Sequence, residues 1–260
     1  MQRDVNITAK NIVTCFDSVG REYPDNDLHW GNDIPWLFGE LDKHSSLYPI
    51  RILYPGCGPG RLFTTLSGFS EKIYSVLAMD MSSVMTKEAT AALFRIASFS
   101  RLGVSVVQQN FMTDILEDEE GGEFDLVLCL NNTLGNIIDG DYKGARMLRE
   151  DALRRFGQRL RYGGFLFLTV YNRDLLPREE NSLYSPFLKI NTDESDFSSG
   201  DLSMVFSREG VPDIQFYSHW FTEPELKGLL KSQGFSTRAD EGYVVAKCGP
   251  RFLCLGRYLA

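Results

Sequence analysis

A short glycine-rich stretch constrains this chain more than any other part of its sequence. Residues 51–62 read RILYPGCGPGRL, in which the uncharged apolar run 52–54 leads into alternating glycines. Such a run is typical of a strand buried on both faces. Alternating glycines let the chain turn sharply at positive φ and bring backbone N–H groups close to a ligand. Residues 61–69 then show helical spacing, so the stretch predicts a strand, a ligand-binding turn and a helix. The glycines of this turn are Gly56, Gly58 and Gly60.

A carboxylate follows at the spacing expected for a ribose contact. Asp80 ends a second apolar run, residues 73–79, and stands twenty positions after Gly60. At the end of a second strand, a carboxylate can accept hydrogen bonds from both hydroxyls of a ribose. A glycine turn alone is also compatible with a tight turn that binds nothing. Together with Asp80, the turn predicts a cofactor that contains a nucleoside.

The glycine spacing indicates which cofactor. Dinucleotide-binding turns favour G-x-G-x-x-G, whereas this turn is G-x-G-x-G. YPGCGPG followed by AMDMS resembles motifs one and two of the class I S-adenosylmethionine-dependent methyltransferases, of the type that acts on small molecules. The resemblance implies S-adenosylmethionine as cofactor, with its methionine part against the glycine turn and its ribose on Asp80. The cofactor contacts that we expect are Tyr23, Gly56, Cys57, Gly58, Gly60, Asp80, Met81, Asn110, Phe111 and Leu130.

Asn110 departs from the family pattern. The family commonly has an acidic residue here, at the end of the third strand, which accepts a hydrogen bond from the adenine amine. The amide oxygen of Asn110 can accept that bond but brings no charge. The alternative is that Asn110 is a simple turn residue at a strand end.

Substrate-side candidates come from several parts of the chain. NNTLGNI, residues 131–137, follows the apolar run 124–130 and is similar to a segment of small-molecule N-methyltransferases of the glycine methyltransferase kind. Ligands of open α/β sheets bind at the carboxyl ends of strands, which makes paired amides there suggestive. The alternative for His219 is a structural role in the core or at its rim. The alternative for the N-terminal aromatic residues is that they pack as a cap on the edge of the sheet. The catalytic candidates are Asn131, Asn132 and His219, and the substrate candidates are His29, Trp30, Tyr171 and Tyr217.

The whole chain predicts one α/β domain. We expect a Rossmann-like, doubly wound, mostly parallel seven-stranded sheet with an antiparallel last strand, an N-terminal helical cap and a β-hairpin insertion. Residues 1–49 would form the cap, 50–172 the cofactor-binding core, 173–221 the substrate-side insertion, and 222–260 the C-terminal helix and closing strands. The remaining expected strands are 104–109, 165–171, 202–206, 215–221, 235–238 and 252–258, and the remaining helices are 83–99, 142–161 and 223–234, the last with a capping box.

The amino-acid composition limits the classes of binding partner that we expect. Lys and Arg number 27 against 35 Asp and Glu, a net charge of −8, so nucleic acid is disfavoured. Neither a membrane-length apolar run nor a signal peptide is evident, which predicts a cytoplasmic protein without a membrane partner. The five cysteines lack metal-ligand spacing and are expected to be free thiols, with no metal site. We expect a monomer or homodimer.

These features predict an enzyme that transfers a methyl group from S-adenosylmethionine to a nitrogen or oxygen of a small molecule. Two alternatives remain. One is a protein that binds S-adenosylmethionine without transfer, because no single residue is obligatory for the reaction. The other is a nicotinamide-dependent oxidoreductase, which would favour a later third glycine and a catalytic Tyr/Lys pair.

Overall fold

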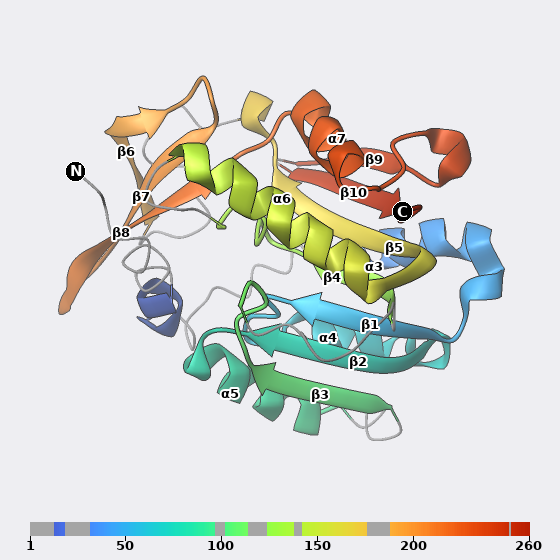
Figure 1. Ribbon diagram of the computed structural model, residues 1–260. Coiled ribbons are helices and arrows are strands. Elements are labelled where there is room, and N and C mark those ends of the chain that lie inside the picture. The colour runs from blue at the N-terminus through green and yellow to red at the C-terminus, as the bar shows by residue number, and fades with distance from the viewer. Residues whose placement is uncertain are drawn as a thin grey trace.

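A computed structural model describes residues 13–18, 32–96, 102–113, 124–137, 142–175, 188–249 and 251–260. Two sheets organise these residues (Figure 1). The predicted contacts Tyr23, His29 and Trp30 lie outside the described residues. None of the described helices is long and apolar enough to cross a membrane.

The large sheet has seven strands in the order β3-β2-β1-β4-β5-β10-β9. Neighbouring strands pair in parallel from β3 to β5, and β10 runs antiparallel to both β5 and β9. The predicted mostly parallel sheet with an antiparallel last strand is therefore confirmed. The strands are β1 (Ile50–Pro55), β2 (Ile73–Asp80), β3 (Gly103–Gln108), β4 (Phe124–Cys129), β5 (Leu160–Tyr171), β9 (Val244–Cys248) and β10 (Arg251–Arg257).

Helices cover both faces of this sheet, which explains why its central strands read as continuous apolar runs. Every residue of β4 is buried. In β1, Ile52 and Tyr54 pack toward one helical layer and Leu53 toward the other. The first layer holds α3 (Asp33–Leu41), α4 (Leu62–Ser67) and α5 (Ser83–Phe94), and the second holds α6 (Tyr142–Arg159) and α7 (Glu223–Ser232). Short 3₁₀ turns complete the chain as η1 (Asp42–Leu47), η2 (Ser70–Lys72), η4 (Arg173–Leu175) and η5 (Ala239–Glu241).

The N-terminal segment is attached to the sheet through α3. The carboxylate of Asp33 forms a buried ion pair with Arg251 of β10. Trp36 stacks on Phe167 of β5 with ring centroids 5.6 Å apart. An aromatic side chain of the cap thus packs on the sheet, which agrees with the interpretation of the N-terminal aromatic residues as a structural cap.

Four details of the sequence prediction were wrong. Helix α5 ends at Phe94 and not near residue 99. Helix α6 ends at Arg159 and not at residue 161, and Gly163, at φ 80°, lies within β5. Four arginines at positions 154, 155, 159 and 161 suggest a solvated face at the end of this helix, but Arg159 is 5% exposed. Residues 235–238 form only one isolated bridge, and the expected strand is instead β9, whose VVAKC was overlooked between two glycines.

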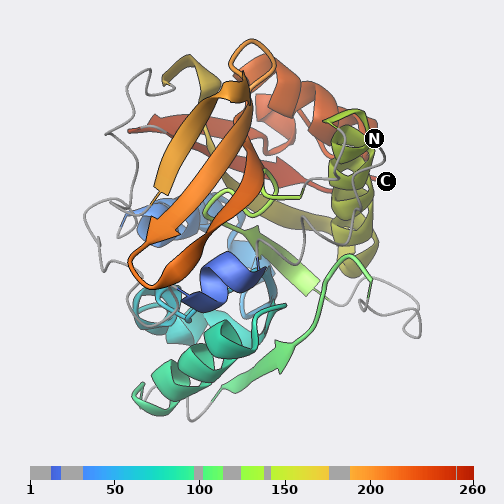
Figure 2. The ribbon, with the colours of Figure 1, turned by 90° about the vertical axis from the view of Figure 1, so that its left-hand side faces the viewer.

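The insertion is larger than the predicted hairpin. β6 (Leu188–Asp196), β7 (Asp201–Arg208) and β8 (Val211–His219) form a separate antiparallel sheet of three strands. The helical residues 13–18, which we call the N-terminal helix, lie beside this small sheet (Figure 2). Both stand in front of the end of the large sheet where β1 and β4 finish (Figure 2). After the insertion, Thr222 and Glu225 form the predicted capping box of α7.

Candidate active site

The glycine turn joins β1 to α4, and its three glycines all have positive φ, between 55° and 76°. A Cβ on Gly56 would lie 2.7 Å from the Thr133 side chain, and one on Gly60 would lie 2.6 Å from the Phe63 ring. Packing therefore requires glycine at these two positions. A Cβ on Gly58 would meet no atom within 4 Å. The turn thus leaves open space over Gly58, as a cradle for a closely approaching ligand would.

Asp80 connects this turn to the end of β2. Its Oδ2 accepts a hydrogen bond from the Gly58 N–H at 2.9 Å, and its Oδ1 accepts one from the Ser82 N–H at 2.9 Å. Burial raises the pKa of Asp80 above its ordinary value, although both N–H groups favour the ionised form. The carboxylate is therefore held rigidly, with acceptor capacity left for further donors.

The N-terminal helix reaches the same place. Asp17 forms a hydrogen bond with the hydroxyl of Ser82, and that hydroxyl also accepts from the Met85 N–H at 3.0 Å, which caps α5. The charge of Asp17 contributes to the raised pKa of Asp80. Cys15 of the same helix packs in one cluster with Met85. The helix therefore borders the position expected for the ribose.

The predicted adenine contacts lie after β3. The side-chain oxygen of Asn110 accepts a hydrogen bond from the Met112 N–H at 2.9 Å, so Asn110 does shape the strand-end turn. Phe111 is buried, with its ring 5.5 Å from that of Phe156. Met81 is half-buried next to Asp80. Asn110 thus has a role in the turn, and its contact with adenine stays a prediction.

Two consecutive asparagines in left-handed conformation follow β4. Asn131 has φ 56° and Asn132 has φ 59°. Non-glycine residues in this conformation are uncommon, and strained backbone of this kind clusters at functional sites. The Asn131 N–H donates to the Thr169 hydroxyl at 2.6 Å, while its Oδ1 is buried without a hydrogen-bond partner among the described residues. Leu130, just before this pair, is fully buried.

Asn132 is buried and joins three segments. Its Oδ1 accepts from the Tyr171 N–H at 3.2 Å, and its Nδ2 donates to the Ser218 hydroxyl at 3.0 Å and the His219 carbonyl at 3.1 Å. Gly135 permits this junction, because a Cβ there would lie 2.3 Å from the same carbonyl. Asn132 therefore fixes the loop after β4 against the ends of β5 and β8.

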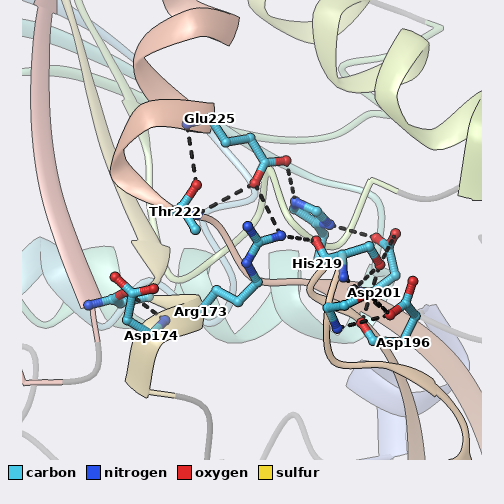
Figure 3. A network of polar contacts seen from close by, with 10 residues as sticks. Arg173, Asp174, Asp196, Asp201, His219, Thr222 and Glu225 are labelled. Carbon is cyan, nitrogen blue, oxygen red and sulfur yellow. Dashed lines mark hydrogen bonds and ion pairs between the residues drawn. The ribbon is translucent and has the colours of Figure 1, made fainter.

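His219 lies between two carboxylates (Figure 3). Its Nδ1 is 2.6 Å from Oδ1 of Asp201, and its Nε2 is 2.8 Å from Oε1 of Glu225. Burial raises the pKa of each carboxyl, but the hydrogen bond and charge of His219 together with smaller contributions from other neighbours outweigh it, so both pKa values are lowered. Ionised carboxylates only accept, so a ring that donates from both nitrogens would satisfy both of them. The guanidinium of Arg173 completes the network at 3.8 Å from Glu225.

The two predicted substrate-side tyrosines occupy different places. Tyr171 ends β5 beside Asn132, and its ring centroid is 4.8 Å from that of Trp220. Tyr217 is 8% exposed and packs with Ala145 of α6, on the face of β8 opposite Phe216. The structure thus brings Asn131, Asn132 and Tyr171 to one edge and leaves Tyr217 away from it.

Sequence reasoning overlooked several residues of this region. Asp17 was expected only as part of the N-terminal helical cap, and nothing in its spacing signals a hydrogen bond to Ser82. Asp201 was not singled out, and Glu225 was assigned only to the capping box. The weak signal available is that His219 ends a strand shortly before a capping box, which places the imidazole near the first turn of the helix.

The fold defined by this sheet order is that of S-adenosylmethionine-dependent methyltransferases. The solved structure of the CcbJ methyltransferase from Streptomyces caelestis is similar, with TM-score 0.65 and 15% identity over 94% of this chain and 96% of that chain. A 1,6-didemethyltoxoflavin-N1-methyltransferase from Burkholderia thailandensis, solved with S-adenosylhomocysteine, gives TM-score 0.59 and 19% identity over 99% of this chain and 92% of that chain. The predicted resemblance to class I methyltransferases is confirmed in the fold.

Sequence comparison gives a more particular similarity. Glycine N-methyltransferase from Oryctolagus cuniculus is 30% identical over 142 residues, which are 54% of this chain and 45% of the relative. The chain thus matches less than half the length of that curated relative. No family model matches the chain.

Proposed function

We propose that this chain is an S-adenosylmethionine-dependent methyltransferase. The observation that carries the proposal is the open cradle over Gly58 with the Asp80 carboxylate beside it, at the carboxyl edge of a methyltransferase fold. The methionine part of the cofactor would lie against Gly56, Cys57, Gly58 and Gly60, and its ribose hydroxyls would donate to Asp80. Met81, Asn110 and Phe111 would contact the adenine, and Leu130 the methyl side.

The acceptor would be a nitrogen or oxygen of a small molecule. When bound, the cofactor supplies a methyl group already activated on a sulfonium. The residues around the site would direct the acceptor lone pair at that methyl group, and the acceptor proton would be released to water. The protein's main tasks are then to position the acceptor and to exclude water.

All five cysteines are free thiols, which agrees with a cytoplasmic location.

The candidate residues take different parts in this proposal. Asn131 would contact the acceptor, and its buried side-chain oxygen without a hydrogen-bond partner among the described residues supports this role. Asn132 and His219 would act by positioning, since their polar atoms are engaged with neighbouring segments. Tyr171 would form a wall of the acceptor site. The proposal also retains the roles predicted from the sequence. His29 and Trp30 would contact the substrate, and Tyr23 would contact the cofactor.

Binding without transfer is the second candidate, favoured by one observation. The small sheet and the loop after β4 are tightly joined through Asn132, which would hold the substrate side closed. The nicotinamide alternative has weaker support, because the glycine spacing does not match and the fold is that of methyltransferases.

Cofactor choice is tested by thermal unfolding. S-adenosylhomocysteine should raise the Tm in a concentration-dependent way, because a ligand that binds only the folded state stabilises it by mass action. NAD at the same concentrations should leave Tm unchanged. A shift with NAD and none with S-adenosylhomocysteine would reject the proposed function.

The cradle is tested by paired glycine substitutions. Gly58→Ala should cost about 1–2 kcal/mol of stability from left-handed backbone strain, because its Cβ meets no protein atom. It should also weaken S-adenosylhomocysteine binding at least tenfold, since the Cβ would occupy the cofactor's space. Gly60→Ala is the matched comparison, and it should lose more stability because its Cβ would lie 2.9 Å from the backbone of Ala89. Urea unfolding and calorimetry measure both quantities, and wild-type affinity in Gly58→Ala would contradict the cradle.

A further inference from the structure

One oxygen of the Asp33 carboxylate is buried without a partner. Asp33 is the first residue of α3 and is 2% exposed. Its Oδ2 pairs with the guanidinium of Arg251, whereas its Oδ1, among the described residues, accepts from no donor. A carboxylate has acceptor capacity on both oxygens, and buried polar groups without a partner are uncommon in native structures. The ion pair with Arg251 therefore accounts for only one of the two oxygens.

This carboxylate lies at the carboxyl edge of the large sheet. Its partner Arg251 starts β10 and is paired with Tyr171, the last residue of β5. Asp33 also acts on Tyr54, which stands two residues before Gly56 at the end of β1. Burial raises the pKa of the Tyr54 hydroxyl well above its ordinary value, and the charges of nearby acidic groups, Asp33 among them, raise it further. Asp33 thus connects the start of β10 electrostatically with the strand that leads into the glycine turn.

The order of the strands indicates which part of the cofactor would reach Asp33. The proposed function assigns adenine to the residues after β3, ribose to Asp80 at the end of β2, and the methionine part to the turn after β1. These three strands are consecutive in the sheet, and β4, β5 and β10 follow β1 on its other side. A cofactor that lies across these strand ends would therefore direct the amino-acid end of its methionine part toward the side where Asp33 and Arg251 stand.

We propose that Asp33 is a further cofactor-binding residue, and that its Oδ1 accepts a hydrogen bond from the α-ammonium of the cofactor's methionine part. This rests on the proposed function. The α-ammonium is the cationic N–H donor of the cofactor, since ribose and adenine donate from neutral groups. Burial raises the pKa of Asp33 to about 6 although Arg251 lowers it, so a second cation would favour the ionised form. The alternative is that Asp33 serves only to attach α3 to the sheet.

The test compares two ligands that differ only in the α-ammonium, namely S-adenosylhomocysteine and its deamino analogue, in which a hydrogen replaces that group. Calorimetry at pH 8 measures the affinity of both ligands for wild-type protein and for three variants. Asp33→Asn removes the charge of the proposed acceptor. Arg251→Gln breaks the same ion pair but keeps the carboxylate. Asp42→Asn removes an equal charge directly after α3, where the side chain is 50% exposed and pairs with Lys72.

Wild-type protein and Asp42→Asn should prefer S-adenosylhomocysteine over the deamino analogue. In Asp33→Asn this preference should fall about tenfold to a hundredfold, as expected for loss of a hydrogen bond between charged groups. Arg251→Gln should retain the preference, whereas an ion pair that is purely structural would make both variants alike. If Asp33→Asn does not fold, Asp33→Asn combined with Arg251→Gln leaves no unpaired buried charge and should show the same fall relative to Arg251→Gln.

Proton release gives a second measurement that a structural role would not change. At pH 6 wild-type protein should release more protons with S-adenosylhomocysteine than with the deamino analogue, because the ammonium lowers the pKa of Asp33. Calorimetry in buffers of different ionisation enthalpy measures this difference, which should vanish in Asp33→Asn. Of the other groups near Asp33, Arg251 stays charged and Tyr54 stays neutral at this pH. Asp80, whose pKa is also raised, would meet the same ribose in both ligands.

The outcomes separate this inference from the proposed function. If S-adenosylhomocysteine binds but its preference over the deamino analogue is unchanged in Asp33→Asn, or is lost equally in Arg251→Gln, Asp33 does not bind the α-ammonium and the proposed function stands. Equal proton release with the two ligands in wild-type protein also overturns the inference. If wild-type protein binds no S-adenosylhomocysteine, the inference and the proposed function both fail.

Discussion

Replacing His219 with alanine is expected to lower the free energy of unfolding by about 3–5 kcal/mol, the range for removing one partner of a buried ion pair. The expectation rests on Asp201, whose side chain is 9% exposed and would keep a buried charge without its cation. Glu225 contributes less, since its side chain is 35% exposed and water can solvate it. Urea unfolding of wild-type and variant protein measures the difference.

Two further variants isolate the cause. His219→Ala combined with Asp201→Asn should be more stable than His219→Ala alone, because the amide leaves no buried charge and can still accept from the Ser199 hydroxyl. Arg238→Ala removes an exposed ion pair with Asp240 and should leave stability nearly unchanged. Wild-type stability of His219→Ala would show that the network in Figure 3 does not hold the small sheet to α7.

The same network explains what a sequence reader could and could not infer about His219. Alternation in β8 places Tyr217 and His219 on one face, and that much follows from the sequence. The carboxylates of Asp201 and Glu225 come from another strand and from a helix, eighteen and six residues away. Such contacts depend on how the small sheet docks, and no local pattern encodes docking. A core role for His219 was the alternative weighed from the sequence, and the burial observed agrees with it.

The core of the fold was predictable because its signals are local. The glycine turn, Asp80 and the apolar runs of β1 and β4 each occupy a few consecutive residues, and parallel strands buried on both faces are strongly apolar. The edge of the sheet was less predictable. Val244–Cys248 is only half-buried and short, so its pattern is weak, whereas Phe235 and its neighbours appeared more strand-like but make a single bridge.

The candidate site was predictable in its cofactor half for the same reason. Motif residues at the turn and at Asp80 converge because consecutive parallel strands end at one edge. The acceptor half is built by segments distant in sequence, namely the N-terminal helix, the loop after β4 and the small sheet. Asn132 shows the difficulty. As one of two consecutive asparagines it suggested substrate contact, but its side chain forms hydrogen bonds with Tyr171, Ser218 and His219.

Asp80→Ala is expected to weaken S-adenosylhomocysteine binding about tenfold to a hundredfold. The ribose hydroxyls would lose a charged acceptor, and hydrogen bonds to charged groups are worth about 1.5–3 kcal/mol, at about 1.4 kcal/mol per decade of affinity. The Gly58 N–H also loses its partner, which loosens the cradle and adds to the loss. Isothermal titration calorimetry with S-adenosylhomocysteine measures the affinity of each protein.

Two further variants, Asp80→Asn and Asp240→Ala, distinguish the effect of the local charge at Asp80 from the effect of the protein's net charge. The asparagine keeps an acceptor oxygen for one of the two N–H groups but has no charge, so its affinity should lie between wild type and Asp80→Ala. Asp240 is 65% exposed beside Arg238, and its removal changes the net charge equally without touching the turn. Affinity should therefore be unchanged in Asp240→Ala. If Asp80→Ala binds S-adenosylhomocysteine as tightly as Asp240→Ala does, the ribose assignment is wrong, and Asp80 serves only to hold the glycine turn.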